Sequence, residues 1–477
     1  MRLVVVGGGM TGLAAAHRAL ELTRERGIAL ALTLVEARER LGGTIATEHA
    51  GGFLVEAGPD SFLSEKPWAL ALCRRLGLED RLVRTDDRYR KVFVWRAGRL
   101  HPLPEGFQLL APTRLVPFVS SGLFSWPGKL RMALDLVLPR GVADDESLGA
   151  FVRRRFGREA LERVAQPLVA GIYTADPDDL SLTATMPRFA ELEKRERSII
   201  LGLRRAGRSA PEAGVSGARF GLFVTLKEGM EELVAALATR LQPGTVLLKQ
   251  RVVGIERRGG RWRVASAEGV NLDADRVVVA TESHAAARML RYVDPTLAML
   301  LAEVPYASSA TVTLGYRRAD VPHPLDGFGF VVPRAEGRAL LACTFSSVKY
   351  PGRAPEGAAL LRGFVGGALN EAVLELDDVT LVMRTRDELR RAMGITAAPV
   401  LTRVFRWPKA MPQYHVGHLA RVETIERLVG ALPGLDLAGG AYRGVGIADC
   451  VWSGEAAAER ALGISAASWA SAPRGGG

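Results

Sequence analysis

The sequence predicts a mixed α/β protein in which a dinucleotide-binding domain is interrupted by two further domains, one built on an antiparallel sheet and one helical. A glycine-rich turn between a strand and a helix opens the chain, as is typical of dinucleotide-binding domains. A second glycine-rich run, residues 439–450, follows a strand near the other end. Between them lie a mainly helical stretch, residues 107–205, and a β-rich stretch, residues 295–425.

Length and charge narrow the class of protein. The 477 residues correspond to two or three domains, at about 100–200 residues each. With 63 basic and 52 acidic residues the net charge is +11, but no basic block is interleaved with aromatic residues, so we expect no nucleic-acid partner. Attraction to an anionic lipid surface or to an acidic small molecule fits better. Three widely spaced cysteines without a C-x-x-C pair indicate a reducing, cytoplasmic compartment.

The two ends carry simple expectations. The opening "MRLVVVGGG" is a strand that leads directly into the glycine turn, so we expect no signal peptide before the fold. No stretch of 18 apolar residues is free of charge and proline, so we expect no transmembrane helix. We expect residues 467–477, which end in "APRGGG", to form a disordered tail.

The first glycine run has the spacing of a pyrophosphate-binding turn. Gly7, Gly9 and Gly12 in "RLVVVGGGMTGLAAAHRALE" match G-x-G-x-x-G: the first makes the tight turn, the second lets the backbone approach a pyrophosphate, and the third lets helix and strand pack closely. The next strand ends at Glu36, 24 residues beyond Gly12, where an acid binds the ribose. The acid favours an unphosphorylated ribose, as in NAD or FAD.

A glycine doublet decides between these two cofactors. Gly42 and Gly43 follow the ribose acid directly, as "RERLGG". This arrangement resembles the amine oxidase and phytoene desaturase superfamily, whose doublet contacts the flavin end of FAD. The second glycine run is not a second dinucleotide site, because no new ribose acid follows it. We expect residues 444–447 to aim a helix N-terminus at the flavin, where the helix dipole stabilises the negative charge of the reduced ring.

One segment of the helical stretch is unusually apolar. Residues 106–134 combine many Leu, Phe and Trp side chains with Arg114, Lys129 and Arg131. Such a segment can lie in a membrane interface. It can equally form a helix pair that packs on the core or covers a substrate tunnel, and the sequence leaves both interpretations open.

Across essentially its whole length the chain resembles the bacterial protoporphyrinogen oxidases. The narrowest motifs are "GIYTADPDDLS", "RWPKAMPQYHVGH" and "AGGAYRGVGIADC". The resemblance implies a discontinuous Rossmann-like FAD-binding domain, an antiparallel-sheet substrate domain and a helical, membrane-binding domain. The expected FAD-binding domain is 1–85 with 215–293 and 430–466, the substrate domain is 86–104 with 294–429, and the helical domain is 105–214.

The resemblance implies a six-electron oxidation of protoporphyrinogen IX to protoporphyrin IX in haem biosynthesis, as three hydride transfers to FAD, with O2 as acceptor giving H2O2. The nearest rival substrate is coproporphyrinogen III, which a second cationic patch in the pocket would favour. More distant hypotheses are an amine oxidase, a carotenoid desaturase, or a flavin-binding scaffold without catalysis. The resemblance also suggests peripheral association with the cytoplasmic face of the membrane, a homodimer, and transfer of the product to ferrochelatase.

The site residues follow by matching positions. The expected FAD contacts are Gly7, Gly8, Gly9, Met10, Thr11, Gly12, Glu36, Ala37, Gly42, Gly43, Thr44, Gly58, Pro59, Asp60, Ser61, Val252, Trp407, Val445, Gly446 and Ile447. The expected substrate contacts are Gly171, Val331, Val332, Thr344 and Phe364, with Arg90 and Lys91 as candidates for the propionates.

Two departures from the family pattern stand out: Thr344 occupies a position where the family often has Leu, and Asp60 replaces an Asn. No catalytic side chain is expected, because hydride loss from an electron-rich porphyrinogen needs no general base. His415 and His418 have no third ligand nearby in the sequence, so we expect no metal.

Overall fold

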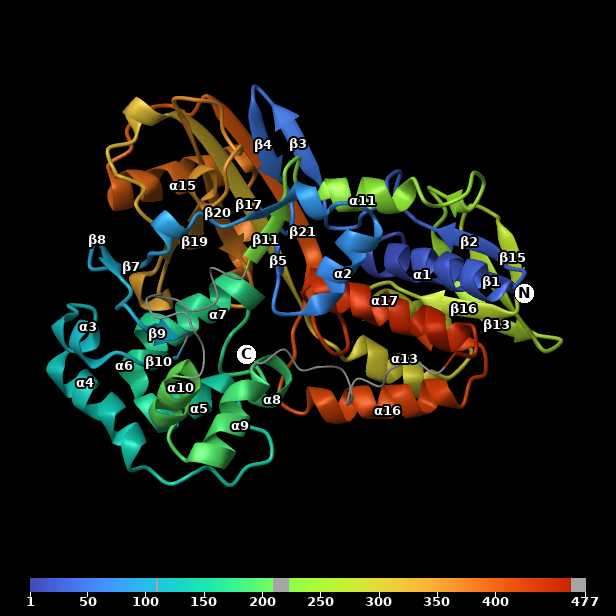
Figure 1. Ribbon diagram of the computed structural model, residues 1–477, viewed down its shortest axis with the longest axis horizontal. Coiled ribbons are helices and arrows are strands. Elements are labelled where there is room, and N and C mark those ends of the chain that lie inside the picture. The colour runs from blue at the N-terminus through green and yellow to red at the C-terminus, as the bar shows by residue number, and fades with distance from the viewer. Residues whose placement is uncertain (109, 209–222, 465–477) are drawn as a thin grey trace.

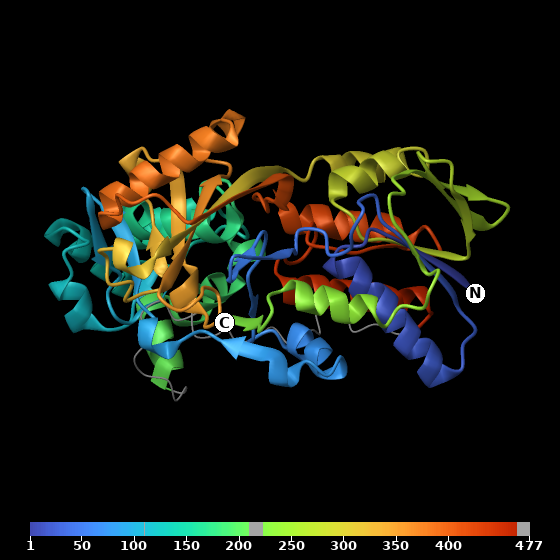
Figure 2. The same cartoon turned by 90° about the horizontal axis from the view of Figure 1, so that it is seen from above.

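The computed structural model describes residues 1–108, 110–208 and 223–464. Seen from above, the chain forms two lobes, and the N-terminus lies in one of them (Figure 2). The predicted tail, residues 467–477, lies outside the described residues.

The first lobe is built on a five-stranded parallel sheet. Valine and leucine runs that are buried on both faces form its central strands, as a parallel sheet requires. In spatial order the strands are β12 (Val246–Leu247), β2 (Ala31–Val35), β1 (Arg2–Val6), β16 (Arg276–Val279) and β22 (Leu435–Leu437). The sheet therefore assembles from three distant parts of the chain, residues 2–35, 246–279 and 435–437, which confirms a discontinuous Rossmann-like arrangement.

Each face of this sheet has its own core. One face packs against α1 (Met10–Arg26), α2 (Pro67–Arg75), α11 (Glu231–Ala238) and α17 (Ile447–Ala461). The other packs against the antiparallel strands β13 (Val252–Arg258), β14 (Arg261–Ser266) and β15 (Asn271–Ala274), and against α12 (Ser283–Leu290), α13 (Pro295–Ala302) and α16 (His418–Gly430). Figure 1 shows α1 and α17 lying next to each other.

The second lobe contains a seven-stranded sheet. Its order is β21 (Leu401–Pro412), β17 (Tyr306–Arg317), β20 (Ala358–Gly366), β19 (Leu340–Phe345), β18 (Gly329–Val331), β7 (Val92–Arg96) and β8 (Arg99–Pro102). All neighbours are antiparallel except β18 and β7, which pair in parallel because β7 arrives from a distant, earlier part of the chain. α15 (Asp378–Met393) packs its apolar side chains on one face of this sheet.

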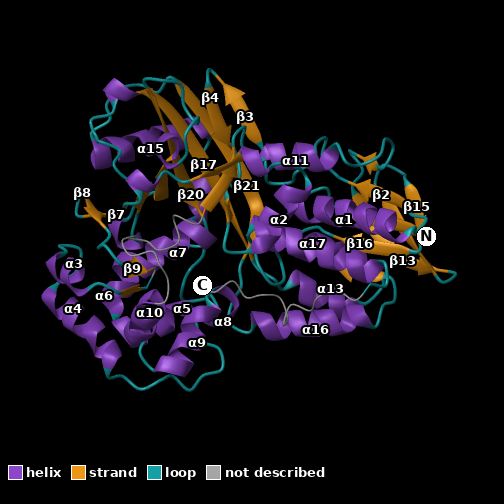
Figure 3. Ribbon diagram, viewed as in Figure 1, coloured by secondary structure: helices purple, strands orange, loops and turns teal. Residues whose placement is uncertain are grey.

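The helical part faces the opposite side of the same sheet, and Figure 3 shows its helices grouped beside the strands. It comprises α3 (Leu115–Ser120), α4 (Trp126–Ala133), α5 (Leu148–Phe156), α6 (Arg158–Ala160), α7 (Gln166–Tyr173), α8 (Leu182–Thr185), α9 (Pro187–Glu196) and α10 (Ile199–Arg208). A short hairpin of β9 (Phe107–Gln108) and β10 (Ala111–Pro112) precedes it. Among the described residues, no helix combines the length and apolar character needed to cross a bilayer.

Short elements connect the two lobes. They are β3 (Thr47–Ala50), β4 (Phe53–Glu56), β5 (Phe62–Leu63), β6 (Leu82–Arg84), β11 (Phe223–Leu226) and α14 (Ser346–Lys349). β3 pairs with β4, and β5, β11 and β6 form a small antiparallel sheet. The loop between β4 and β5, residues 57–61, thereby passes between the parallel sheet and the seven-stranded sheet.

Candidate cofactor and substrate site

One continuous cavity of about 2640 Å³ joins the two lobes. Its first part follows the carboxyl ends of β1, β2 and β16, where the crevice of a doubly wound sheet lies. Its second part lies between the seven-stranded sheet and the helices α7, α8 and α9. Both glycine-rich runs of the sequence line this cavity, so they serve one site and not two.

The N-terminal glycines leave room for a phosphate. Gly7 has a φ of +104°, and a Cβ there would meet the Ala280 carbonyl oxygen at 2.7 Å. Gly9 caps α1, and a Cβ there would meet only the Cα of Gly43, at 3.9 Å, so the space beside Gly9 belongs to the cavity. The free backbone N–H groups at the start of α1 open onto this space, as a pyrophosphate requires.

The ribose acid and the glycine doublet lie beside this turn. The Glu36 carboxylate accepts hydrogen bonds from the backbone N–H groups of Gly8, at 2.6 Å, and Arg38, at 2.8 Å. The backbone N–H of Gly42 donates to the Gly8 carbonyl at 2.8 Å. These bonds hold Glu36 and the doublet at the rim of the cavity, next to the phosphate space.

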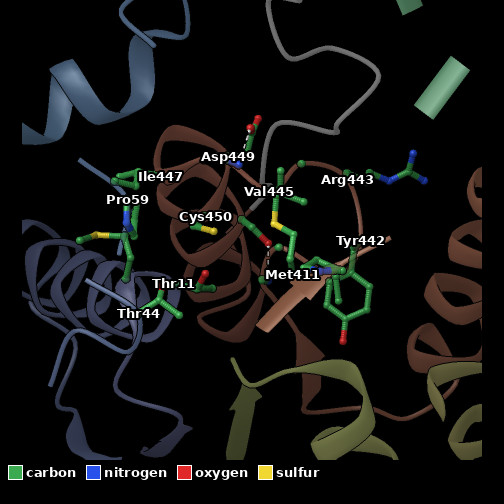
Figure 4. A pocket seen from close by; sticks show the side chains of 18 of the residues that line it. Thr11, Thr44, Pro59, Met411, Tyr442, Arg443, Val445, Ile447, Asp449 and Cys450 are labelled. Atoms are coloured by element: carbon green, nitrogen blue, oxygen red, sulfur yellow. Dashed lines mark hydrogen bonds between the residues drawn. The ribbon is translucent and has the colours of Figure 1, made fainter. Parts of the chain in front are cut away.

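The second glycine run places another helix start on the same cavity. α17 begins at Ile447 with Gly446 as its N-cap, and the Asp449 carboxylate accepts from the Gly446 N–H at 3.3 Å. Lys66 Nζ donates to both carboxylate oxygens of Asp449 at 2.7 Å. Figure 4 shows Thr11, Thr44 and Pro59 together with Val445 and Ile447 around the pocket. The start of α17 therefore lies opposite residues from the first part of the chain.

Aromatic side chains support the second glycine run from behind. Tyr414 donates its hydroxyl to the Gly440 carbonyl at 2.6 Å, and its ring stacks on His418 with centroids 4.0 Å apart. Burial lowers the pKa of His418 to about 4, so the ring is neutral at pH 7. Its Nε2 lies 2.7 Å from the Tyr442 carbonyl, which can only accept, so Nε2 carries the proton.

The loop at residues 57–61 carries a charged pair next to the cavity. Lys349 Nζ contacts the Asp60 carboxylate at 3.0 Å, and Ser61 donates to it at 2.6 Å. Burial alone would raise the pKa of Asp60, but the attraction of Lys349 and then Arg362 outweighs it and lowers that pKa to about 2. The Asp60 carboxylate is thus an ionised partner for these cations.

The second part of the cavity has mainly apolar walls. Val331, Thr344 and Phe364 line it from three neighbouring strands, and Gly171 lines it from α7. A Cβ at Gly171 would be in ordinary van der Waals contact with Ala342 and Val331, at 3.6 and 3.7 Å, so α7 approaches the sheet closely at this point. Apolar walls of this kind suit a flat, largely apolar ring.

Most predicted site residues lie on the cavity. Five do not belong to its lining. Gly8 and Gly12 are buried in the turn behind it, and Val332 points into the core on the other face of the sheet. Arg90 pairs with Asp87, and Lys91 pairs with Asp326 at 2.7 Å. The structure therefore does not bring Arg90 and Lys91 to the cavity, because acids on the outer surface engage both.

Several charged residues on the cavity were not predicted from the sequence. Lys66, Asp449, Lys349 and Arg362 lie next to the cofactor part, and four cations line the substrate part: Arg188, Lys194, Arg195 and Lys409. In the sequence, a charged residue of a helix or strand that lines a cavity cannot be distinguished from one that faces solvent. Among the described residues, no three His, Cys, Asp or Glu side chains form a group that could hold a metal.

The comparisons agree with this geometry. A model of the family described as flavin containing amine oxidoreductase matches residues 10–462. Coproporphyrinogen III oxidase of Bacillus subtilis is 40% identical over 96% of this chain and 97% of that protein. Protoporphyrinogen oxidase 1 of Arabidopsis thaliana chloroplasts is 31% identical over 97% and 87%. The crystal structure of an Exiguobacterium sp. 255-15 protein, provisionally named a protoporphyrinogen oxidase, is 33% identical over 96% and 98%, with a TM-score of 0.85.

FAD fits the site. The phosphate space beside Gly9, the acid at Glu36 and the helix start at Ile447 match its pyrophosphate, its ribose and its flavin ring. The family model matches nearly the whole chain, so the chain belongs to the flavin containing amine oxidoreductases and is an FAD-dependent oxidoreductase.

Proposed function

We propose that the protein oxidises a porphyrinogen to the corresponding porphyrin in haem biosynthesis. The observation that carries this proposal is the continuity of the cavity, which leads from the FAD part directly to the apolar walls that include Val331 and Phe364. The relatives named above as porphyrinogen oxidases cover almost the whole chain and support it.

The reaction removes six hydrogen atoms as three hydrides and three protons. Bound FAD would supply the hydride acceptor, and with O2 as the final acceptor three O2 would become three H2O2. The residues of the chain hold the macrocycle between apolar walls and keep water from the reacting carbon. The pyrrole nitrogens stabilise the cation left by hydride loss, so no side chain has to act as a general base.

Of the two porphyrinogens, coproporphyrinogen III fits the charges better. It carries four propionates, against two in protoporphyrinogen IX. α9 contributes Arg188, Lys194 and Arg195 to the cavity, and β21 contributes Lys409. The lining also includes the acids Glu191 and Glu282, and Arg195 contacts Glu196 at 3.1 Å, so the four cations outnumber these acids. Cations on two sides of the cavity can bind carboxylates at both edges of the macrocycle.

The first test is a fluorescence assay of porphyrin formation in air with the purified yellow protein. Coproporphyrinogen III and protoporphyrinogen IX are compared at matched concentrations. We expect a clear preference in kcat/KM for coproporphyrinogen III. A clear preference for protoporphyrinogen IX would overturn the substrate choice but keep the reaction. Turnover of neither by protein with bound FAD would overturn the proposed function.

The second test is reversal of the basic charge on α9. Lys194→Glu with Arg195→Glu should lower kcat/KM for coproporphyrinogen by about tenfold, because exposed ion pairs contribute up to about 1 kcal/mol each. The control is Arg384→Glu, an exposed arginine on α15 that does not line the cavity. Equal losses in both proteins would show that only the overall charge matters.

Protoporphyrinogen IX is the second candidate substrate, and one observation favours it. A product without extra propionates is poorly soluble, and large apolar side chains of α3 and α4 are exposed, including Leu115, Val116, Trp126 and Leu130. We propose that this surface binds the cytoplasmic face of the membrane.

Two further proposals are a homodimer and transfer of the product to ferrochelatase. Light scattering would test the dimer, and turnover coupled to ferrochelatase would test the transfer.

A further inference from the structure

Three side chains of the seven-stranded sheet bind one backbone carbonyl of the cofactor loop. The Ala57 carbonyl accepts hydrogen bonds from Thr311 Oγ1 at 3.2 Å, Trp407 Nε1 at 2.9 Å and Arg362 Nη2 at 3.2 Å. The three donors lie on the adjacent strands β17, β21 and β20. A carbonyl oxygen has two lone pairs, so the three donors share them, and together they hold the loop against three strands of the sheet.

Arg362 belongs to both parts of the cavity. Its guanidinium also donates to the Gly58 carbonyl, where the loop that lines the cofactor part begins. On the same strand, the Arg362 guanidinium carbon lies 4.9 Å from the centroid of Phe364, which lines the substrate part. Arg362 is only 4% exposed, and its Nε has no hydrogen-bond partner among the described residues.

The charges around Arg362 sum to a positive value. Asp60 and Glu56 are the acids that face Arg362; Lys349 also faces Asp60, and Arg353 faces Glu56. Burial raises the pKa of Glu56 to about 7, against hydrogen bonds from Met230 and Thr47, so this carboxyl is about half protonated at neutral pH. Three cations thus face one full and one partial negative charge. A buried charge interacts strongly over several ångströms, because little water screens it.

We propose that Arg362 is a positioning residue that locks the loop at residues 57–61 onto the substrate sheet and, through its buried charge, favours the reduced form of the bound flavin. The reduced ring gains negative charge, which a nearby cation stabilises. The proposal rests on FAD binding and not on the identity of the porphyrinogen. Its readouts therefore need no porphyrinogen, and its failure is distinguishable from failure of the proposed function.

The role of the Arg362 charge is tested by two measurements on the FAD-loaded protein: the reduction potential of the bound flavin and the dissociation constant of sulfite. Sulfite adds to oxidised flavin and leaves it anionic. Arg362→Met should shift the potential to a more negative value and weaken sulfite binding at least tenfold. Arg362→Lys, which keeps the charge, should stay within about threefold of the wild type. Should Arg362→Met fail to fold, Arg362→Gln takes its place.

A double variant separates charge from shape. Arg362→Met with Asp60→Asn removes one cation and one anion, so the sum of local charges is unchanged. We expect its potential to return towards the wild-type value. Wild-type potential and sulfite affinity in the neutral single variant would overturn the role of the charge, and so would a double variant no different from the single one.

The locking of the loop is tested by a matched pair on β17. Thr311→Val removes one donor to Ala57 without changing any charge. Thr313→Val removes a buried hydroxyl that has no partner within the described chain, at the position paired with Arg362. The dissociation constant of FAD should rise about fivefold for Thr311→Val, as loss of one neutral hydrogen bond implies, and stay unchanged for Thr313→Val. Equal values for the two variants would overturn the positioning role.

Discussion

The three glycines of the first turn have three different physical roles. Gly7 adopts a left-handed conformation that side chains disfavour. A Cβ at Gly12 would lie 1.8 Å from the Gly7 carbonyl oxygen. The helix can therefore start directly after the turn only if position 12 is glycine. Gly9 is different, because its free side faces the cavity. The fold therefore needs Gly7 and Gly12, whereas the cofactor needs Gly9.

Gly9→Val should fold but bind little FAD, because the valine would occupy the phosphate space. We expect at least a tenfold loss of bound FAD, measured from the flavin absorbance per protein. The far-ultraviolet circular dichroism should resemble that of the wild-type protein freed of FAD. Gly12→Val is the contrasting variant and should lose folded protein as well. A Gly9→Val protein with stoichiometric FAD would contradict the assignment of this turn.

Glu56 should make the free energy of unfolding depend on pH. Burial raises its folded pKa from 4.5 to about 7, so between these values the unfolded chain releases a proton that the folded protein keeps. Its contribution is complete below about pH 4.5 and is lost as the pH rises to about 7, by at most about 3 kcal/mol. Glu56→Gln should therefore lose less stability than the wild type between pH 5 and pH 8, measured by urea unfolding. Identical pH dependence would contradict this.

At the scale of elements, the close packing of α1 and α17 brings the two ends of the cofactor site together. A Cβ at Gly454 of α17 would lie 2.1 Å from the Thr11 carbonyl oxygen of α1. The helices can approach this closely only because position 454 has no side chain. Since α1 starts at one end of the site and α17 at the other, their spacing sets the distance between the two ends.

Gly454→Ala should push α1 and α17 apart. We expect a loss of about 1–3 kcal/mol in the free energy of unfolding, as overpacked cores show, together with weaker FAD binding. Thermal unfolding and FAD titration measure the two effects. Gly430→Ala at the exposed end of α16 is the control, since a Cβ there meets nothing within 4 Å. Equal stability of the two variants would contradict the packing argument.

Elements with local signals were predictable. The turns at Ala97–Gly98 and Gly259–Gly260 have positive φ at both residues and join the hairpins β7–β8 and β13–β14; three of these four residues are Gly, which adopts this conformation easily. The long strand β21 lies within the β-rich stretch at residues 295–425, but no local signal marks it as a strand. Pro408 and Pro412 interrupt its pattern, and such prolines are tolerated because β21 is at the edge of the sheet.

At the scale of the whole molecule, the apolar surface of α3 and α4 lies at the outer end of the helical part, away from the parallel sheet (Figure 1). Leu115 is 68% exposed and Leu130 is 69% exposed. This surface belongs to the helical domain predicted at residues 105–214. We keep the predicted domain boundaries as a proposal.

The double variant Leu115→Asp with Leu130→Asp should abolish binding to vesicles that contain anionic lipid, because two charges in an interface oppose insertion. Co-sedimentation measures the bound fraction. Val379→Asp with Met383→Asp is the matched control, since these side chains of α15 are 69% and 56% exposed on another face. Equal binding by both proteins would exclude this surface from membrane contact.

The sequence by itself determined the fold class and the FAD turn, and matching positions with the family placed most of the predicted contacts on the cavity. The fold class and the turn depend on patterns within a few residues, such as glycine spacing or an acid after a strand. Only the tertiary structure decided which cations face the cavity. Arg90 and Lys91 were placed by approximate position, yet outer acids hold them, while Arg362 reaches Ala57 across 305 residues of chain. No local pattern encodes such a contact, because it exists only once two lobes built from distant segments have packed together.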